Sequence, residues 1–167
     1  MLHFPLPTIM KKTLSILLIG FLAISCGVKK PIKNKSEFEN GWYFVTEPKT
    51  ESKAVKNNFG DDFVYVEPVP ILIASDYSKI GIAKPNWGGK EMTIIELVYD
   101  GNEKEKWANA TERMSKTNEK AVFIYNNKFI STVSAFMRMD NGYASVSNEN
   151  FNEKMLTDIV ADLKKQK

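Results

Sequence analysis

Cysteine and histidine are nearly absent from this chain: Cys26 and His3 are the only residues of these two types. His3 precedes Met10, where we expect translation to start, because residues 1–9 contain two prolines and fit a signal sequence poorly. A mature chain without histidine and with one cysteine cannot build Ser-His-Asp or Cys-His catalytic sites, nor the usual zinc sites. Glycine-rich phosphate motifs are missing as well. The sequence therefore predicts no catalytic residue, no cofactor and no metal site.

A short apolar run near the N-terminus ends at the single cysteine. Lys11 and Lys12 are followed by the uncharged residues 14–24, a serine and then Cys26. This order is typical of a signal peptide, here residues 1–25, whereas a helix that spans a bilayer needs roughly 20 apolar residues. The stretch "LAISC" resembles the lipobox of bacterial lipoproteins, which implies that Cys26 is lipidated and becomes the first mature residue. Two alternatives stay open: a secreted protein with an incidental cysteine, and an uncleaved anchor.

The lipobox resemblance also implies a location and a membrane partner. Lipid on Cys26 implies a protein of the cell envelope that is anchored in a membrane and faces the periplasm. Residues 26–40 carry charges, a proline and few apolar side chains, so we expect a lipidated tether, followed by one folded domain over residues 41–167. The chain has 23 basic and 20 acidic residues, and two of the lysines lie in the leader. This near balance predicts no nucleic-acid partner.

Carboxylates are the remaining candidates for acid-base chemistry. Glu96 lies in an otherwise apolar segment, and burial raises the pKa of a carboxyl group, so Glu91 or Glu96 beside Asp100 is a candidate pair for an enzyme that acts on cell-wall sugars. The alternative that we favour places Glu96 on the solvent side of a sheet. Asp61 and Asp62 are adjacent and follow a glycine, which indicates a solvated turn.

Apolar patterning predicts an α+β fold. Two helices are expected: one is capped by Asn102 with Trp107 as its core anchor, and the other is capped by Asn152. Pro68 and Pro70 lack a backbone donor, so their strand-like run should lie at a sheet edge or cross out of the sheet. The expected architecture is an antiparallel or mixed sheet of about four to six strands with two helices packed on one face. The strand-like runs are 41–46, 63–74, 91–100, the two halves of 120–137, and 142–147, with a connection expected over 47–62.

Two asparagine-containing turns are expected between strands. Asn126 and Asn127 predict a two-residue type I′ hairpin, because asparagine tolerates positive φ. Residues 140–142, Asp-Asn-Gly, predict a second hairpin turn and are too few for a calcium-binding loop.

These elements, taken in order, resemble a known family. Residues 70–164 resemble the head subdomain of the first periplasmic domain of SecDF, the auxiliary subunit of bacterial protein export. Thr132 and Asn141 depart from that pattern, which has a proline and a glycine at these places. The family's proton-coupled work uses transmembrane helices, so the resemblance implies only what the head does, which is to lie in the periplasm and contact an emerging polypeptide. The matching positions are Thr111, Lys120, Ala121, Phe123, Ile124, Asn127, Ile130, Ser131, Gly142, Ala144 and Phe151.

The resemblance implies a non-catalytic, lipid-anchored periplasmic domain that binds a protein partner or an unfolded polypeptide. Trp87 lies in the glycine-containing stretch "PNWGGK" and is a candidate contact residue, with a lid over the sheet as its alternative role. Two other functions stay open. One is a structural accessory of an envelope complex with one fixed partner, and the other is the carboxylate-based enzyme acting on cell-wall glycans.

Overall fold

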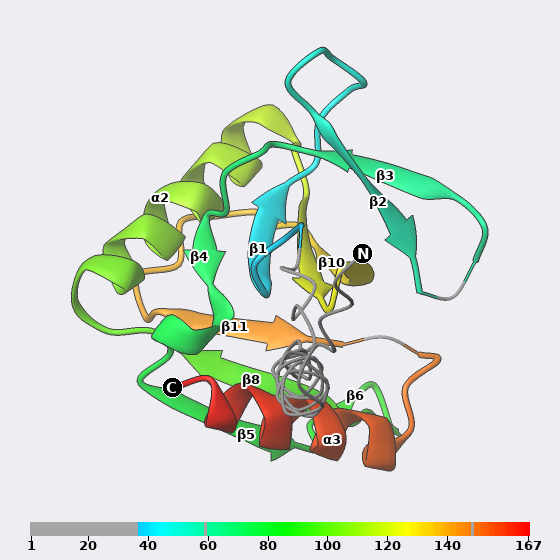
Figure 1. The fold of residues 1–167 in the computed structure, drawn as a ribbon. Coiled ribbons are helices and arrows are strands. Elements are labelled where there is room, and N and C mark those ends of the chain that lie inside the picture. The colour runs from blue at the N-terminus through cyan, green and yellow to red at the C-terminus, as the bar shows by residue number, and fades with distance from the viewer. Residues whose placement is uncertain (1–36, 59, 148) are drawn as a thin grey trace, which may run out of the picture. The chain divides into compact units, whose positions relative to one another are not determined.

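The structure, a computed structural model, describes residues 37–58, 60–147 and 149–167, which form strands, one short 3₁₀ helix and two α-helices (Figure 1). The helices are η1 (Ala74–Asp76), α2 (Gly101–Thr117) and α3 (Glu153–Lys165). The strands are β1 (Gly41–Phe44), β2 (Lys53–Asn57), β3 (Phe63–Val66), β4 (Leu72–Ile73), β5 (Lys79–Ala83), β6 (Asn86–Trp87), β7 (Lys90–Glu91), β8 (Ile94–Val98), β9 (Ala121–Tyr125), β10 (Lys128–Val133) and β11 (Tyr143–Val146).

The largest sheet has six strands in the order β3-β2-β10-β9-β1-β4. The β2–β10 pair is parallel and the other pairs are antiparallel, so the sheet is mixed. The predicted α+β class, with a mixed sheet of this size and two helices, is confirmed. Three strands form a second sheet in the order β11-β8-β5, and β6 and β7 form a hairpin of their own.

The six-stranded sheet curls so that its edge strand β3 reaches the end of β1. Val66 at the end of β3 forms an antiparallel bridge with Val45, just after β1. The backbone N–H of Thr46 donates to the carbonyl of Tyr65 (2.9 Å), and that of Glu67 donates to the carbonyl of Phe44 (3.0 Å). The curl encloses a small apolar cluster of buried residues: Phe38, Tyr43, Val55, Val66, Val122 and Ile124.

Pro68 and Pro70 lie in the connection that leads from β3 to β4, the two ends of the strand order. A proline in a central strand would leave a gap in the hydrogen-bond ladder, and this connection avoids that cost. The expectation that this run lies at a sheet edge or leaves the sheet is confirmed. The expected connection over residues 47–62, however, contains the strand β2, which pairs with β3 in a hairpin.

The run 91–100 is divided between two sheets. Glu91 ends β7, and β8 starts only at Ile94. The turn at Gly88 and Gly89 folds β7 back on β6, and the backbone N–H of Met92 donates to the carbonyl of Pro85 (3.0 Å). The prediction of one ten-residue strand is therefore wrong, whereas the central place expected for its apolar part is confirmed, because β8 lies between β5 and β11.

Helix α2 begins two residues earlier than expected. Its N-cap is Asp100, whose side chain makes no capping hydrogen bond, so the assignment of Asn102 as the cap is wrong. The predicted core anchor is correct, because Trp107 is fully buried. At α3 the cap is correct: the side chain of Asn152 accepts a hydrogen bond from the backbone N–H of Met155 (2.8 Å). Figure 1 shows α3 lying along β5 and β8, whereas α2 contacts β4.

Both helices cover the main core, which lies between the two sheets. The ring centroid of Trp42 on β1 is 5.2 Å from that of Trp107 on α2 and 5.1 Å from that of Phe123 on β9. Buried aromatic groups of this size supply much of a domain's hydrophobic stabilisation. The largest fully buried side chains of this core include Trp42, Tyr99, Trp107, Phe123, Ile95, Leu97, Met114 and Leu156.

The two asparagine turns have different outcomes. Asn126 and Asn127 have φ values of 50° and 62° and join the antiparallel strands β9 and β10, so the predicted hairpin is confirmed. Residues 140–142 do form a turn, with φ of 68° at Gly142, but the strands on either side of it, β10 and β11, belong to different sheets. The prediction of a hairpin at this second turn is wrong.

Candidate functional site

Glu96 lies on the outer face of the three-stranded sheet. Its register partners are Gly81 on β5 and Ser145 on β11, and all three residues are half-exposed. The flanking residues Ile95 and Leu97 point to the other face and are fully buried. The favoured expectation for Glu96, a place on the open side of the sheet, is confirmed.

The carboxylate of Glu96 acts as a hydrogen-bond acceptor. Tyr143 Oη donates to Glu96 Oε1 over 3.0 Å. Burial, followed by this hydrogen bond and the negative charge of Glu96, raises the pKa of Tyr143 to about 12. The tyrosine therefore keeps its proton at neutral pH and holds the carboxylate in place.

Replacing Glu96 by glutamine should lower the pKa of Tyr143 from about 12, because a neutral amide removes the charge that opposes tyrosinate. Ultraviolet titration of tyrosinate measures this, with Tyr143→Phe identifying the signal and Glu91→Gln as the control. Because folding raises the pKa of Tyr143 above 10, its contribution to stability is present below pH 10 and is lost as the pH rises toward 12. An unchanged titration in Glu96→Gln would contradict the pairing.

The other candidate carboxylates are exposed and belong to separate elements. Glu91 lies in β7 and Asp100 at the N-cap of α2. Asp61 and Asp62 lie between β2 and β3, where Asp61 Oδ1 is 3.5 Å from a lysine Nζ. The solvated turn predicted there is confirmed. Among the described residues, no three acidic, histidine or cysteine side chains are grouped so that they could hold a metal ion.

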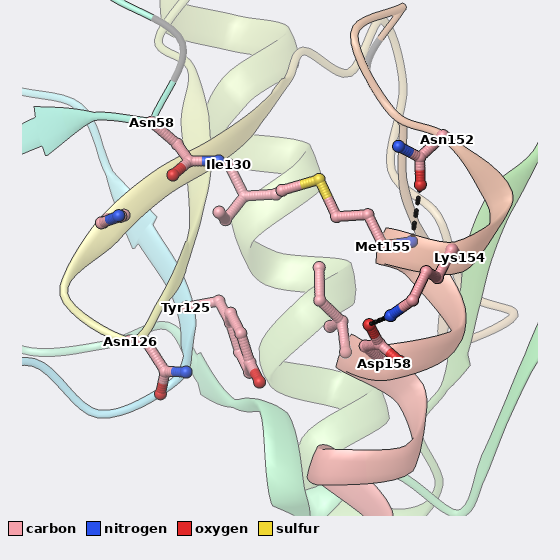
Figure 2. Close-up of a pocket in the computed structure, with 10 residues that line it drawn as sticks. Asn58, Tyr125, Asn126, Ile130, Asn152, Lys154, Met155 and Asp158 are labelled. Atoms are coloured by element: carbon pink, nitrogen blue, oxygen red, sulfur yellow. Dashed lines mark hydrogen bonds and ion pairs between the residues drawn. The ribbon is translucent and has the colours of Figure 1, made fainter.

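A cavity of about 420 Å³ lies between the β9–β10 hairpin and the start of α3, and we name it the hairpin groove (Figure 2). Its apolar floor is formed by side chains that include Ile130 and Met155, and Ile159 also lines it. Two of these, Ile130 and Ile159, are buried, and Met155 is half-buried. The remaining lining residues are Asn58, Tyr125, Asn126, Lys128, Asn152, Lys154 and Asp158.

The polar side chains of the hairpin groove are held by local contacts. Lys154 Nζ pairs with Asp158 Oδ2 at 2.6 Å, one turn along α3. Tyr125 Oη donates to Asp162 Oδ2 over 2.7 Å, and burial, followed by this carboxylate, raises the pKa of Tyr125. The Asn152 side chain accepts from the Met155 N–H, which fixes the amide at the entrance (Figure 2).

The chemistry of the hairpin groove suits binding. Its asparagine side chains offer amide donors and acceptors, which can pair with the main chain of a peptide, and the apolar floor can accept a side chain. The described residues that line it include no cysteine, serine or histidine, and the one carboxylate among them, that of Asp158, is paired with Lys154.

Comparison with known proteins gives a fold likeness without a sequence match. No family model and no curated protein matches the sequence. One similar solved structure is described as the crystal structure of SecDF in a super-membrane-facing form, with a TM-score of 0.59 at 9% identity over 74% of this chain. The chain has a SecDF-like fold. The resemblance that the sequence predicted is therefore confirmed at the level of the fold.

A second SecDF structure, described as a membrane component that enhances protein export, has a TM-score of 0.55 at 10% identity and covers 98% of this chain. The chain spans 18% of the length of the first SecDF chain and 71% of the second. Of the helices that the structure describes, none is long and apolar enough to cross a membrane.

The two residues that the sequence singled out for attachment and contact are not tested by the structure. Cys26, with the signal peptide and most of the tether, lies outside the described residues. Trp87 ends β6 and pairs in register with Lys90, but its side chain lies outside the described part of the chain. Lipidation of Cys26 and a partner contact at Trp87 stay predictions.

The SecDF-like fold presents an apolar pair that sequence reasoning missed. Phe136 and Met137, in the loop between β10 and β11, are 94% and 70% exposed. The sequence pattern placed both at the end of a strand-like run. The signal that could have identified them is the turn at Gly142, since a chain that leaves β10 for another sheet needs a connecting loop.

Proposed function

We propose that this protein is a non-catalytic, lipid-anchored domain of the cell envelope that faces the periplasm and contacts exported or envelope polypeptides through the hairpin groove. The observation that carries the proposal is the SecDF-like fold, because one similar structure is described as a component that enhances protein export. The lipobox ending at Cys26 supports attachment to a membrane.

The hairpin groove supports a role in binding peptides of varied sequence. Amide side chains at its rim pair with main-chain groups, which every peptide carries, while Ile130, Met155 and Ile159 provide a surface for one apolar side chain. An open groove of this kind favours weak contacts with many polypeptides over one tight complex.

Photo-crosslinking in intact cells tests the contact. A photoreactive residue at Lys128, on the rim of the hairpin groove, should crosslink to many different exported polypeptides. The matched control is the same residue at Lys164, which is exposed on the last turn of α3, outside the lining of the groove. A single crosslinked product at Lys128 would indicate the structural accessory with one fixed partner. Equal crosslinked products at Lys128 and Lys164 would contradict the proposal that polypeptides bind in the hairpin groove.

The same cells test the anchor. Growth with radioactive palmitate should label the wild-type chain, and Cys26→Ala should abolish the label. Equal labelling of the two chains would contradict lipidation at Cys26. The two tests are independent, because crosslinking at Lys128 reports on the groove whether or not the chain is lipidated.

A further inference from the structure

The loop of residues 134–142, which joins β10 to β11, presents apolar side chains to solvent on a well-anchored backbone. Phe136 and Met137 are its exposed pair. The next residue, Arg138, makes hydrogen bonds to three side chains of α2: Glu105 (2.9 Å), Asn109 (2.6 Å) and Glu112 (3.2 Å). An apolar pair held in place before contact is typical of a binding element, because little conformational entropy is lost on association.

Two more hydrogen bonds hold the loop in place, one within the loop and one to α2. The Arg138 Nε donates to Asp140 Oδ1 within the loop (2.6 Å), and the backbone N–H of Met139 donates to Thr111 Oγ1 (2.9 Å). Thr111 is fully buried on α2 and donates in turn to the carbonyl of Ala108. The loop is therefore tied to the helix on the C-terminal side of the exposed pair.

An apolar cavity of about 370 Å³ lies on the other flank of the same helix, and we name it the α2 cavity. Phe44, Val69, Ile71 and Ala110 supply its apolar lining, and Val69 is 70% exposed. The loop and the α2 cavity are neighbours through one residue, because Asn109 lines the cavity and its Oδ1 accepts from Arg138 Nη1.

The charges beside the two features differ in net sign: the acidic Glu105 and Asp140 outnumber Arg138 beside the exposed pair, and the basic Lys106 and Arg113 outnumber Glu67 in the lining of the α2 cavity. Glu105 and Asp140, next to the exposed pair, are 64% and 66% exposed at their side chains. Lys106 and Arg113, which line the α2 cavity, are 57% and 40% exposed. Each of these charges has a partner within the chain, so contact between copies exchanges or shares ion pairs, and the charge pattern contributes to orientation more than to affinity.

We infer that the outer face of α2 is a two-fold interface between two copies of this chain, with Phe136 and Met137 of each copy seated in the α2 cavity of the other. An apolar pair on one flank of α2 and an apolar cavity on the other flank exchange places under a two-fold rotation about an axis through the outer face of the helix, which is the property of an isologous dimer. The apolar pair then loses its exposure to water, and the acidic residues beside it approach the basic residues of the partner's cavity.

Paired substitutions test this arrangement in the full chain, extracted in detergent. Phe136→Ser and Val69→Asp should each raise the dimer Kd about tenfold or more, because each removes both contacts of the symmetric pair. A mixture of the two variants should dimerise more tightly than either alone. In the mixed dimer the intact Phe136 of one copy meets the intact α2 cavity of the other. Sedimentation equilibrium measures the dimer Kd of each variant and of their mixture. Circular dichroism checks that each variant is folded.

Cysteine pairs locate the contact. Met137→Cys in one tagged copy and Val69→Cys in another should form a disulfide between copies on mild oxidation, whereas Met137→Cys with Phe63→Cys, on the exposed part of β3, should not. Each single cysteine variant, oxidised without the other, is the control for disulfides formed with Cys26. A chain that stays monomeric at every concentration, or a mixture no tighter than its components, would overturn the inference. Neither result bears on the hairpin groove, whose residues are unchanged.

Discussion

Replacing Gly142 by alanine should lower the free energy of unfolding by at least about 2 kcal/mol. Gly142 has φ of 68°, a left-handed conformation that alanine adopts only at a cost of about 1–2 kcal/mol. A Cβ atom at this position would also lie 2.1 Å from the carbonyl oxygen of Tyr99. The backbone cannot easily move away, because the N–H of Tyr99 donates to the carbonyl of Gly142 over 2.9 Å. Urea denaturation measures the loss.

Gly88→Ala is the matched control for the contact with Tyr99. Gly88 also has a positive φ, 61°, but a Cβ there meets no atom within 4 Å. The control should therefore show only the backbone cost of about 1 kcal/mol. The difference between the two variants is the cost of displacing the Tyr99 carbonyl. Equal losses in both would mean that the close packing of the 140–142 turn against Tyr99, just after β8, does not contribute to stability.

Turn and cap chemistry made the local parts of this fold predictable. Asn126 and Asn127 are next to each other in the sequence, and their tolerance of positive φ is a property of the residue type alone. Asn152 caps α3 through a hydrogen bond to a residue three positions away. The cap of α2 was misplaced for a related reason: Asp100 begins the helix without a side-chain hydrogen bond, which is the feature that a capping prediction looks for.

The division of strands between sheets depended on contacts that local patterns do not contain. β2 has the sequence Lys-Ala-Val-Lys-Asn, which is too polar to read as a strand, and only its middle residue, Val55, is buried. β10 and β11 follow each other in the chain but enter different sheets. Only the complete strand order of both sheets reveals this division. Because the alternation of side chains is the same in either sheet, sequence periodicity could not choose between them.

The sequence could predict where a candidate residue lies only when the chemistry of that single residue was sufficient. Glu96 was placed correctly because a single acidic residue in an apolar strand favours the open face. The hairpin groove combines residues from the β9–β10 hairpin and from α3, and the α2 cavity combines the β3–β4 connection with a helix more than 30 positions later. No spacing rule connects such segments, so both cavities required the three-dimensional fold.

Trp107→Ala should lower the free energy of unfolding by about 3–5 kcal/mol, the usual cost of truncating a large buried aromatic residue. Trp107 is 1% exposed and packs on the ring of Trp42. Its Nε1 donates to the carbonyl of Tyr143 over 2.7 Å and so joins α2 to β11 of the three-stranded sheet. Truncation therefore leaves a cavity between the two sheets and also removes the hydrogen bond that connects them.

Trp107→Phe and Trp42→Phe separate the hydrogen bond from the packing. Both changes remove the same atoms from a fully buried site, but Trp42 Nε1 forms no well-directed hydrogen bond within the described residues and interacts only with the side chain of Tyr99. Replacing it by phenylalanine removes a buried donor that is at best weakly satisfied, which offsets part of the lost packing. Trp107→Phe should consequently be more destabilising than Trp42→Phe by about 1–3 kcal/mol in urea denaturation. Equal losses would mean that the bond from α2 to β11 adds nothing beyond the volume of the ring.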